Sequence, residues 1–331
     1  MLRIAYDSRW TDGGIGHFSR EVIAGMEKLC VDLVPIEIGD RLSDPWSPLR
    51  LGRALRGVVA DVFWSPGFMP PWRPSIPAVV TMHDLIHRRH AGVLRRLYYD
   101  TAIRPLVRSM VGVITVSEYS RSVIAAWLGP RSPAIHVVGS GARKVFNDVG
   151  GRMMLDAPYV LYCGNRRAHK NLARMIEAFA RSHAAGQLLL AMTGEPDAAL
   201  EQLARVHGVS ERLRWLGRLE EVDLAKAYRG ASLVLLISLE EGFGLPVIEA
   251  MACATPVVCS STSSLGEIAG NAACLVDPMD VSSIAGGIDR VLSDREWRQT
   301  LIERGLVRYT AYRWDRVAER VLRALKEAAS A

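Results

Sequence analysis

The feature that most constrains this chain is the alternation of short β-rich runs with helical patterns along nearly its whole length. Runs such as "SLVLLIS" at 232–238 are almost entirely apolar, so we expect both faces of these strands to be buried. Apolar strands that are each followed by a helix are typical of parallel sheets covered by helices. The sequence therefore predicts an α/β fold.

The predicted elements fall into two groups with a break between them. Strands are expected over 2–8, 33–38, 61–66, 77–84, 111–117, 134–139, 159–165, 187–194, 213–217, 232–238, 255–260 and 273–277. Helices are expected over 16–30, 94–110, 117–128, 170–183, 197–207, 220–229 and 281–293. One open sheet rarely holds so many strands, and 331 residues exceed the usual size of one core.

The segment 139–158 is rich in glycine and charge and has no sustained period, which indicates a domain boundary. We therefore predict two doubly wound, Rossmann-like domains, residues 1–145 and 146–312. This break and the uneven spacing of the elements argue against a TIM barrel, which also alternates strands and helices. Ligands of such sheets bind beyond the carboxyl ends of the strands, so two domains that face each other would form a ligand-binding cleft.

Composition and charge narrow the possible compartments and partners. The five scattered cysteines form no CxxC pattern and favour buried free thiols in a reducing compartment. No signal peptide and no membrane-spanning run is visible, so we expect a cytoplasmic protein. The net charge is +6, and the stretch 87–108 carries six arginines and one acid. Such a basic stretch, interspersed with leucines, suits either a solvated helix face or the surface of an anionic membrane.

Two candidate sites follow strands of the first domain. In "DSRWTDGGIGHFSREV", Gly14 and Gly16 lie between a strand and a helix, where glycine lets the backbone approach an anionic ligand. The same glycines could serve tight packing alone. His83 follows the strand in "TMHDLIH" and could donate to a substrate hydroxyl or phosphate, or could be a structural histidine.

A third candidate is the basic loop "CGNRRAHKN" at 163–171, which follows the first strand of the second domain. It holds Arg166, Arg167 and Lys170. We expect Lys170 to open the next helix, where a cation is unfavourable unless an anionic ligand lies beside it. The alternative is a solvated basic turn.

The fourth candidate is "ISLEEGFGLPVIEAMACATP" at 237–256. Pro246 suits the first turn of a helix that ends near Cys253, which places Glu241 in the loop and Glu249 in or just past that first turn. Gly242 and Gly244 free the backbone to face a diphosphate. The structural alternative is that the glutamates cap the helix and complement its dipole.

The segment "EEGFGLPVIEAMACATPVVCSSTSSLGEIAG" resembles the E-x7-E segment of the retaining glycosyltransferases of family 4, which have the GT-B fold. "DSRWTDGGIGHFSREV", "TVSEYSR", "GNRRAHKNL" and "YRWDRVAERVL" resemble further segments of that family, so the likeness spans almost the whole chain. The most similar subgroup builds O-antigen and exopolysaccharide chains, often as mannosyltransferases. The resemblance implies two Rossmann-like domains, with a C-terminal helix, 313–331, that packs back on the first.

The resemblance also implies roles for the candidate residues. Glu249 would hold the donor ribose and Glu241 the transferred sugar, while Lys170 and an arginine, Arg166 or Arg167, would neutralise the diphosphate. His83 would point at the reacting sugar. The remaining donor contacts would come from Gly14, Gly16, Asn165, Gly242, Phe243, Gly244 and Leu245. Asn165 stands where the family often has arginine, which leaves the choice of arginine open.

The expected activity is a retaining hexosyl transfer, best matched by mannose from GDP-mannose moving to a lipid-linked or growing polysaccharide acceptor in lipopolysaccharide or exopolysaccharide synthesis. No Asp-x-Asp metal site is visible, so we expect no cofactor and no metal requirement. Peripheral contact of 87–108 with the inner face of the cytoplasmic membrane is a further expectation. Alternatives are a UDP-sugar-dependent transferase with a soluble acceptor and a non-catalytic sugar-nucleotide-binding protein. Nothing supports nucleic-acid binding.

Overall fold

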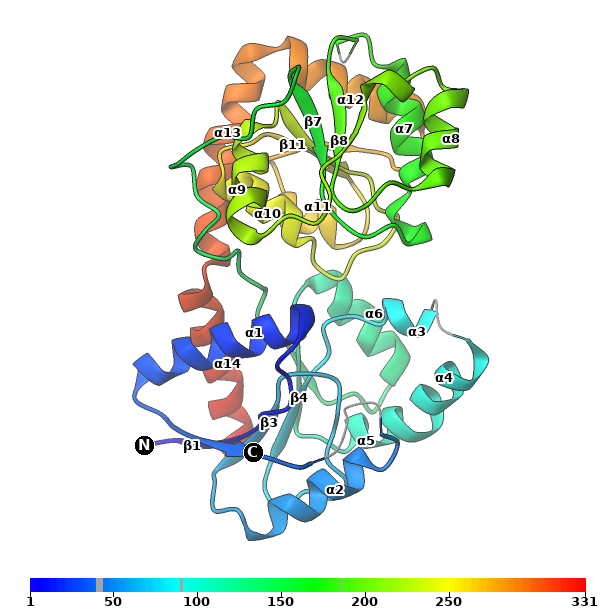
Figure 1. The fold of residues 1–331 in the computed structure, drawn as a ribbon. Helices are drawn as coiled ribbons and strands as arrows, with labels where there is room; N and C mark the ends of the chain where they lie inside the picture. The colour runs from blue at the N-terminus through cyan, green and yellow to red at the C-terminus, as the bar shows by residue number, and fades with distance from the viewer. Residues whose placement is uncertain (40–43, 90–91, 185) are drawn as a thin grey trace. The chain divides into compact units, whose positions relative to one another are not determined.

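The computed structural model describes residues 1–39, 44–89, 92–184 and 186–331, and Figure 1 shows its elements. The chain divides into two compact units. The N-terminal unit comprises Met1–Gly141 and Arg313–Ala331, and the C-terminal unit comprises Ala142–Tyr312. The division falls between Gly141 and Ala142, slightly before the boundary predicted between 145 and 146. The expected cleft between the units stays a prediction.

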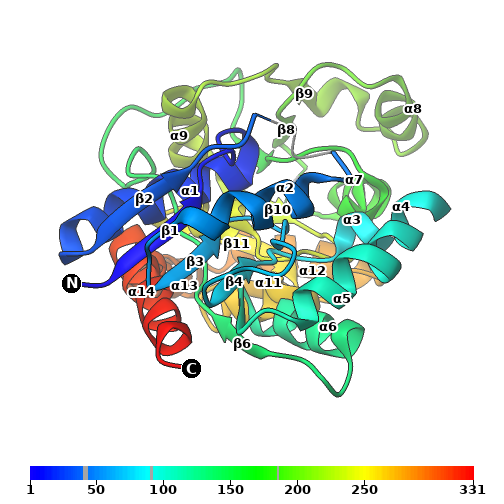
Figure 2. The same cartoon turned by 90° about the horizontal axis from the view of Figure 1, so that it is seen from below.

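The N-terminal unit contains a six-stranded sheet in the order β2-β1-β3-β4-β5-β6, in which all paired strands are parallel. Figure 2 shows β2, β1, β3 and β4 following one another in this order. The strands are β1 (Arg3–Asp7), β2 (Asp32–Ile36), β3 (Val62–Ser65), β4 (Ala78–Thr81), β5 (Gly112–Thr115) and β6 (Ala134–Val137). The order reverses between β1 and β3, which makes this the topological switch point of the sheet.

Helices cover both faces of this sheet. They are α1 (Gly13–Met26), α2 (Ser47–Ala54), α3 (Ile86–Arg89), α4 (Val93–Tyr98), α5 (Arg104–Arg108), α6 (Glu118–Leu128) and α14 (Trp314–Ala329). Helices α1 and α14 lie side by side (Figure 1), and Gly25 permits this because a Cβ there would stand 2.5 Å from the Cβ of Ala318. The C-terminal helix thus belongs to the N-terminal unit.

The single helix predicted over 94–110 is wrong. The structure has α4, then a π-helical turn, η3 (Tyr99–Ile103), and then α5. Pro105 lies in the first turn of α5 and has no N–H to donate to the preceding turn, which the wider π turn accommodates.

The C-terminal unit has a second six-stranded sheet of parallel pairs, in the order β12-β11-β10-β7-β8-β9. Its strands are β7 (Tyr159–Tyr162), β8 (Leu189–Met192), β9 (Leu213–Trp215), β10 (Leu233–Leu236), β11 (Val257–Ser260) and β12 (Cys274–Val276). This order is that of a doubly wound dinucleotide-binding sheet, and it reverses between β7 and β10. The two sheets confirm the predicted α/β class with two Rossmann-like domains.

The helices of this unit are α7 (Leu172–Arg181), α8 (Ala198–Val206), α9 (Glu221–Gly230), α10 (Leu245–Ala252), α11 (Ser263–Ala269), α12 (Val281–Ser293) and α13 (Arg295–Tyr309). Helices α2, α11 and α13, and α3 in the other unit, have no counterpart among the predicted helices. Helix α13 buries only Leu301 and Gly305 among its fifteen residues, so it lacks the apolar stripe by which a helix is recognised.

All five cysteines are free thiols, and Cys253, Cys259 and Cys274 are buried, as predicted. The prediction of burial is wrong for Cys30, which is exposed after the end of a helix, and Cys163 is only half-buried. Within the part of the chain that the structure describes, no helix is both long and apolar enough to cross a membrane.

Candidate functional site

Two loops meet at the switch point of the second sheet. One follows β7 and contains residues 163–171, and the other follows β10 and contains residues 237–244. The backbone N–H of Leu239 donates to the carbonyl of His169 at 2.7 Å, which ties the two loops together. Two of the predicted sequence motifs therefore converge at the place where ligands of such sheets bind.

Lys170 and Glu241 form a buried ion pair between these loops. Lys170 Nζ lies 2.5 Å from Glu241 Oε1, and the two residues are only 8% and 9% exposed. Lys170 ends a 3-10 turn, η4 (Ala168–Lys170), and Asn171 has a left-handed backbone with φ 60°. The expectation that Lys170 opens the next helix is therefore wrong, because α7 begins only at Leu172. The anion beside Lys170 is supplied by the protein itself.

Three serines fix the position of Glu241. Ser238 Oγ donates to Glu241 Oε1 at 2.6 Å, and Ser263 Oγ accepts from the Glu241 N–H at 3.3 Å. Ser264 Oγ donates to the carbonyls of Glu241 at 2.8 Å and Phe243 at 3.0 Å. Sequence reasoning missed these residues, although "TSS" at the start of a helix that follows a buried strand was a signal.

The turn after Glu241 leads directly into α10. Gly242, Phe243 and Gly244 are buried, and Leu245 is half-buried. Gly244 has φ +103°, and a Cβ there would stand 2.5 Å from Leu265, so only glycine fits this position. The Phe243 ring packs edge-on against Tyr312 at 5.6 Å between centroids. This packing gives Phe243 a structural role as well as its predicted one.

Glu249 is buried beyond the first turn of α10. Its Oε2 accepts a hydrogen bond from the hydroxyl of Tyr228, in α9, at 2.9 Å. Burial raises the pKa of Glu249 to about 7, although Tyr228 and the nearby Arg143 act in the opposite direction. Within the described residues this is the one hydrogen bond to the carboxyl group, so its second oxygen can accept from a ligand hydroxyl. No sequence signal distinguished Tyr228.

The two arginines of the β7 loop differ in their contacts. Arg166 donates to the Glu195 carbonyl, lies 3.6 Å from an Asp197 carboxylate oxygen, and stacks over the Trp215 ring at 4.6 Å. Arg167 is exposed, and its guanidinium makes no hydrogen bond or ion pair within the described residues. Asn165, also exposed, accepts from the Arg167 backbone N–H at 3.2 Å. Arg166 is thus engaged by its own unit, whereas Arg167 is available.

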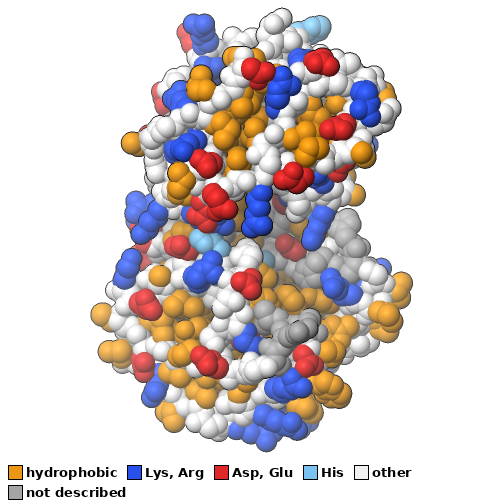
Figure 3. All heavy atoms as spheres, in the orientation of Figure 1, with side chains coloured by type: hydrophobic (Ala, Val, Ile, Leu, Met, Phe, Trp, Pro, Cys, Tyr) orange, Lys and Arg blue, Asp and Glu red, His pale blue; other side chains and the backbone are white. Residues whose placement is uncertain are grey.

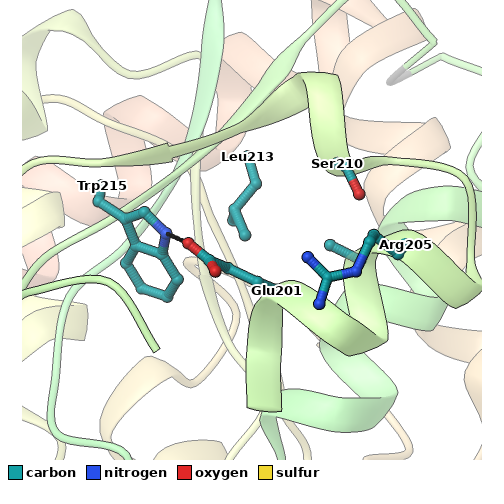
Figure 4. Close-up of a pocket in the computed structure, with 6 residues that line it drawn as sticks. Glu201, Arg205, Ser210, Leu213 and Trp215 are labelled. Atoms are coloured by element: carbon teal, nitrogen blue, oxygen red, sulfur yellow. Dashed lines mark hydrogen bonds between the residues drawn. The ribbon is translucent and has the colours of Figure 1, made fainter. Parts of the chain in front are cut away.

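A separate pocket of about 290 Å³ lies beside Trp215, and Figure 4 shows its lining. Trp215 Nε1 donates to Glu201 Oε1 at 3.3 Å at one side of it. The lining residues are Glu201, Ala204, Arg205, Ser210, Leu213 and Trp215. None of the predicted site residues is among them, so this pocket is not the predicted donor site.

The glycines of the first unit differ in what they allow. Gly14 and Gly16 both lie in the first turn of α1, which begins at Gly13, rather than before a helix that starts at residue 16 as predicted. A Cβ on Gly16 would stand 2.2 Å from the backbone of Thr11, whereas a Cβ on Gly14 would meet nothing within 4 Å. Close backbone packing is thus enough to require glycine at 16. Gly14 leaves open space in which a ligand could lie.

His83 is held in one orientation after β4. Its Nε2 lies 3.1 Å from the Pro66 carbonyl, and its ring packs edge-on against Phe18 at 4.8 Å between centroids. Burial lowers the pKa of His83, which favours the neutral ring. A neutral imidazole has one N–H, and the carbonyl needs it. The nitrogen left for a ligand is therefore Nδ1, an acceptor, rather than the donor that the sequence suggested.

At the switch point of the first sheet, Asp7 and Arg9 form a second buried ion pair, which sequence reasoning missed. Arg9 Nε donates to Asp7 Oδ1 at 2.8 Å and Arg9 Nη2 donates to Asp7 Oδ2 at 2.7 Å. Trp10 Nε1 also donates to Asp7 Oδ2 at 3.2 Å, and Arg9 Nη1 donates to Ser47 Oγ at 2.6 Å. In the described parts of both units, no group of three or more His, Cys, Asp or Glu side chains is placed to hold a metal ion.

Known proteins match both units. The family model "Glycosyl transferases group 1" matches residues 152–308, and "Glycosyl transferase 4-like domain" matches residues 13–141. O-antigen chain mannosyltransferase B of Escherichia coli is 28% identical over 84% of this chain and 77% of its own length. Glycogen synthase of Mycobacterium tuberculosis is 30% identical over 82% of this chain and 71% of its own length.

The fold is also found in a solved structure. The Anabaena protein HepE, in complex with UDP and glucose, superposes with a TM-score of 0.72 at 16% identity, over 99% of this chain and 100% of that one. At this low identity, the likeness shows a shared fold and nothing about activity. The matches of sequence show that the chain is a glycosyltransferase of family 4 with a group 1 domain at residues 152–308, and the superposition shows that it has the GT-B fold.

Proposed function

We propose that this protein transfers a hexose from a nucleotide diphosphate sugar, with retention, to a glycan acceptor in cell-surface polysaccharide synthesis. The observation that carries the proposal is the buried pair of Lys170 and Glu241 at the switch point of the second sheet. A buried cation is costly unless it is paired, and here one carboxylate oxygen serves as its partner. The site is thus charged, largely shielded from water and close to two helix N-termini.

In this proposal Lys170 binds the diphosphate. Its ammonium has three donors, and Glu241 is its one partner within the described residues. The two remaining donors can bind phosphate oxygens. When the bond between sugar and phosphate breaks, negative charge develops on the leaving phosphate, and a fixed cation in a shielded site stabilises that charge. We propose no metal requirement because Lys170 and an arginine supply this positive charge. Loss of turnover in EDTA would contradict this.

The second arginine of the proposed site is Arg167. It is exposed and unpaired within the described residues, while Arg166 is stacked on Trp215 and engaged with Asp197. Recruiting Arg166 to a phosphate would break these contacts, whereas recruiting Arg167 would break none. Asn165 and the turn from Gly242 to Leu245 would then lie along the donor, as the family resemblance implies.

The two glutamates would hold the polar groups of the donor. The free oxygen of Glu249 can accept from a ribose hydroxyl, since Tyr228 occupies only Oε2. Glu241 would contact the transferred sugar through Oε2, because Oε1 is bound by Lys170 and Ser238. In the other unit, His83 would accept from a sugar hydroxyl through Nδ1, and Gly14 would leave room for the backbone to approach a phosphate. No protein nucleophile is proposed, in keeping with front-face substitution.

For the donor we favour GDP-mannose, and for the acceptor a lipid-linked or growing polysaccharide. The similarity to an O-antigen chain mannosyltransferase over most of both chains supports this choice. A second candidate, transfer from a UDP-sugar to a soluble acceptor, is favoured by the likeness to glycogen synthase and to a structure that holds UDP and glucose. A non-catalytic sugar-nucleotide-binding protein would hydrolyse no donor.

We also propose that the acceptor brings the protein to the inner face of the cytoplasmic membrane. Helix α4 exposes Val93, Leu94 and Leu97, which are 83%, 83% and 56% accessible, beside the exposed Arg95 and Arg96. Apolar side chains flanked by arginines can rest at an anionic lipid surface. In the predicted stretch 87–108, residues 90–91 lie outside the described residues.

The test is a thermal-shift panel of GDP-, UDP- and dTDP-sugars, followed by product analysis with the donor that stabilises the protein most. The proposal predicts stabilisation by GDP-mannose, and transfer of mannose with its α-configuration kept. Stabilisation by a UDP-sugar and transfer to a soluble acceptor would support the second candidate instead. A product of inverted configuration would contradict the retaining mechanism.

A further inference from the structure

A pocket of the N-terminal unit lies outside the proposed donor site. Its volume is about 370 Å³, and it lies among α3, α5 and α6. Two of its lining side chains are arginines and the other four are apolar: Leu85, Arg88, Arg104, Val123, Ala126 and Trp127. Arg88 and Arg104 belong to the basic stretch 87–108 that the sequence singled out, whereas the four apolar residues were not predicted to have a role.

Arg104 is the least satisfied cation of this pocket. Its Nε is buried and has no hydrogen-bond partner, and Nη2 makes one long contact of 3.4 Å with the Leu128 carbonyl. Within the described residues no acid pairs with it. A buried donor without a partner is costly, and a guanidinium offers five donors. Arg104 would therefore gain from an anion in the pocket.

The other charged groups around the pocket leave it positive. Arg88 binds Asp100 through two hydrogen bonds, of 2.9 and 2.6 Å, and Trp127 Nε1 donates to the same carboxylate at 2.7 Å. Arg108 Nε donates to the Leu128 carbonyl at 2.6 Å. Among the groups in these contacts, Arg88, Arg104 and Arg108 outnumber Asp100, whose carboxylate is already bonded to Arg88 and Trp127. An incoming anion would be attracted rather than repelled.

The rest of the surroundings suit an apolar chain. Leu85, Val123, Ala126 and Trp127 form the remaining wall, and α3 packs against α4, which exposes Val93, Leu94 and Leu97. Figure 3 shows hydrophobic and basic side chains together at the right-hand edge of the view, where Figure 1 draws α4. A free phosphate ion would use the arginines alone. A phosphate attached to a hydrocarbon chain would use both surfaces.

We propose that this pocket binds a phosphate group carried by a membrane lipid. Arg104 and Arg88 donate to the phosphate oxygens, and the lipid chain lies towards the exposed apolar face of α4. The inference rests on the proposed membrane-linked acceptor, which it deepens by naming the group that is recognised. The phosphate can come from an anionic phospholipid or from a polyprenyl phosphate, and the two are separated by experiment.

The test measures flotation of the full chain with phosphatidylcholine vesicles that contain either phosphatidylglycerol or a polyprenyl phosphate, at about 0.15 M salt. Arg104→Gln removes the cation, and Ala126→Leu fills the pocket without changing charge. The matched control is Arg53→Gln, an exposed arginine of α2 in the same unit. We expect Arg104→Gln and Ala126→Leu to weaken vesicle binding about tenfold or more, as loss of a charge-assisted hydrogen bond does. Arg53→Gln should change it less than about twofold.

Two controls accompany this test. Circular dichroism melts establish whether each variant is folded. If Arg104→Gln does not fold, Ala126→Leu still tests the pocket. The Kd for the stabilising nucleotide sugar is measured in the same samples, and it should stay at the wild-type value in all three variants. Loss of lipid binding with intact donor binding supports the pocket. If the wild type bound no nucleotide sugar, the proposed function would be contradicted, but the lipid-binding result could still be interpreted.

Three outcomes overturn the inference. Equal weakening by Arg104→Gln and Arg53→Gln would mean that diffuse charge attracts the vesicles. Wild-type protein that floats with neither vesicle has no such site. If inorganic phosphate stabilised the wild type and Ala126→Leu equally, and neither bound vesicles, the arginines would bind a free phosphate ion rather than a lipid. Binding to polyprenyl phosphate vesicles alone supports the inference and identifies the kind of lipid that the pocket binds, whereas binding to both supports a phosphate site of broader specificity.

Discussion

Each of the two sheets reverses its strand order once, yet the buried ion pairs at their switch points differ. In the N-terminal unit the Asp7 carboxylate accepts from Arg9 Nε, from Arg9 Nη2 and from Trp10 Nε1. In the C-terminal unit Lys170 and Glu241 share one contact, of 2.5 Å. The first pair is saturated by its own unit, while the second keeps donors and an acceptor oxygen unused. The difference separates a structural ion pair from one that can bind a ligand.

The largest expected effect contrasts Lys170→Met with Arg9→Met. Either change leaves a buried carboxylate unpaired and should lower the free energy of unfolding by about 3–5 kcal/mol. Lys170→Met should also reduce turnover by about 10²–10³, because a cation next to the leaving phosphate is lost. Arg9→Met should keep near-normal turnover per folded molecule. Urea unfolding and initial rates check this. A loss of turnover in Arg9→Met as large as that in Lys170→Met would contradict this distinction between the two ion pairs.

The next effect concerns Glu249 and pH. A pKa of about 7 in the folded state, against an ordinary value of 4.5, means that ionisation of the buried group destabilises the fold. This cost begins as pH rises above 4.5 and is complete above 7. Two and a half pKa units correspond to about 3 kcal/mol. Relative to Glu249→Gln, the wild type should lose about that much between pH 4 and pH 8 in urea unfolding. Parallel pH profiles of the two proteins would contradict the assignment.

A smaller effect should distinguish the two arginines of the β7 loop. Arg167→Ala should weaken donor binding about tenfold, since an available charged donor is removed. Arg166→Ala should change the donor Kd only slightly and lower the unfolding free energy by about 1 kcal/mol or less, because its contacts with Trp215 and Asp197 are partly exposed. Isothermal titration with the stabilising nucleotide sugar measures both. The reverse ranking would assign the diphosphate to Arg166.

The smallest effect is that of Tyr228→Phe, which removes the hydroxyl bound to Glu249 Oε2. We expect a loss of about 1 kcal/mol in unfolding free energy and a rise in donor KM with little change in kcat. A lower kcat at unchanged KM would mean that Glu249 acts in the chemical step instead.

The sequence predicted the fold well because its strands are strongly apolar and are separated by helical or glycine-rich segments. Each predicted strand is found, and the loops of Lys170 and Glu241 do meet, since both follow strands that flank one switch point. The rest depended on tertiary contacts. Tyr228 looks like any buried residue of an amphipathic helix, and the orientation of Arg166 is set by Trp215 at the end of another strand. The π-helical turn before Pro105 could not be predicted without knowing how the two short helices on either side of it join.

The most direct test of the central claim uses the double variant Lys170→Met/Glu241→Gln, which removes both charges and leaves no unpaired ion at the second switch point. Isothermal titration compares its affinity for the stabilising nucleotide sugar with that of the wild type. We predict that the donor Kd rises at least about tenfold while the variant stays folded. An unchanged Kd would show that the incompletely bonded pair between β7 and β10 does not bind the donor.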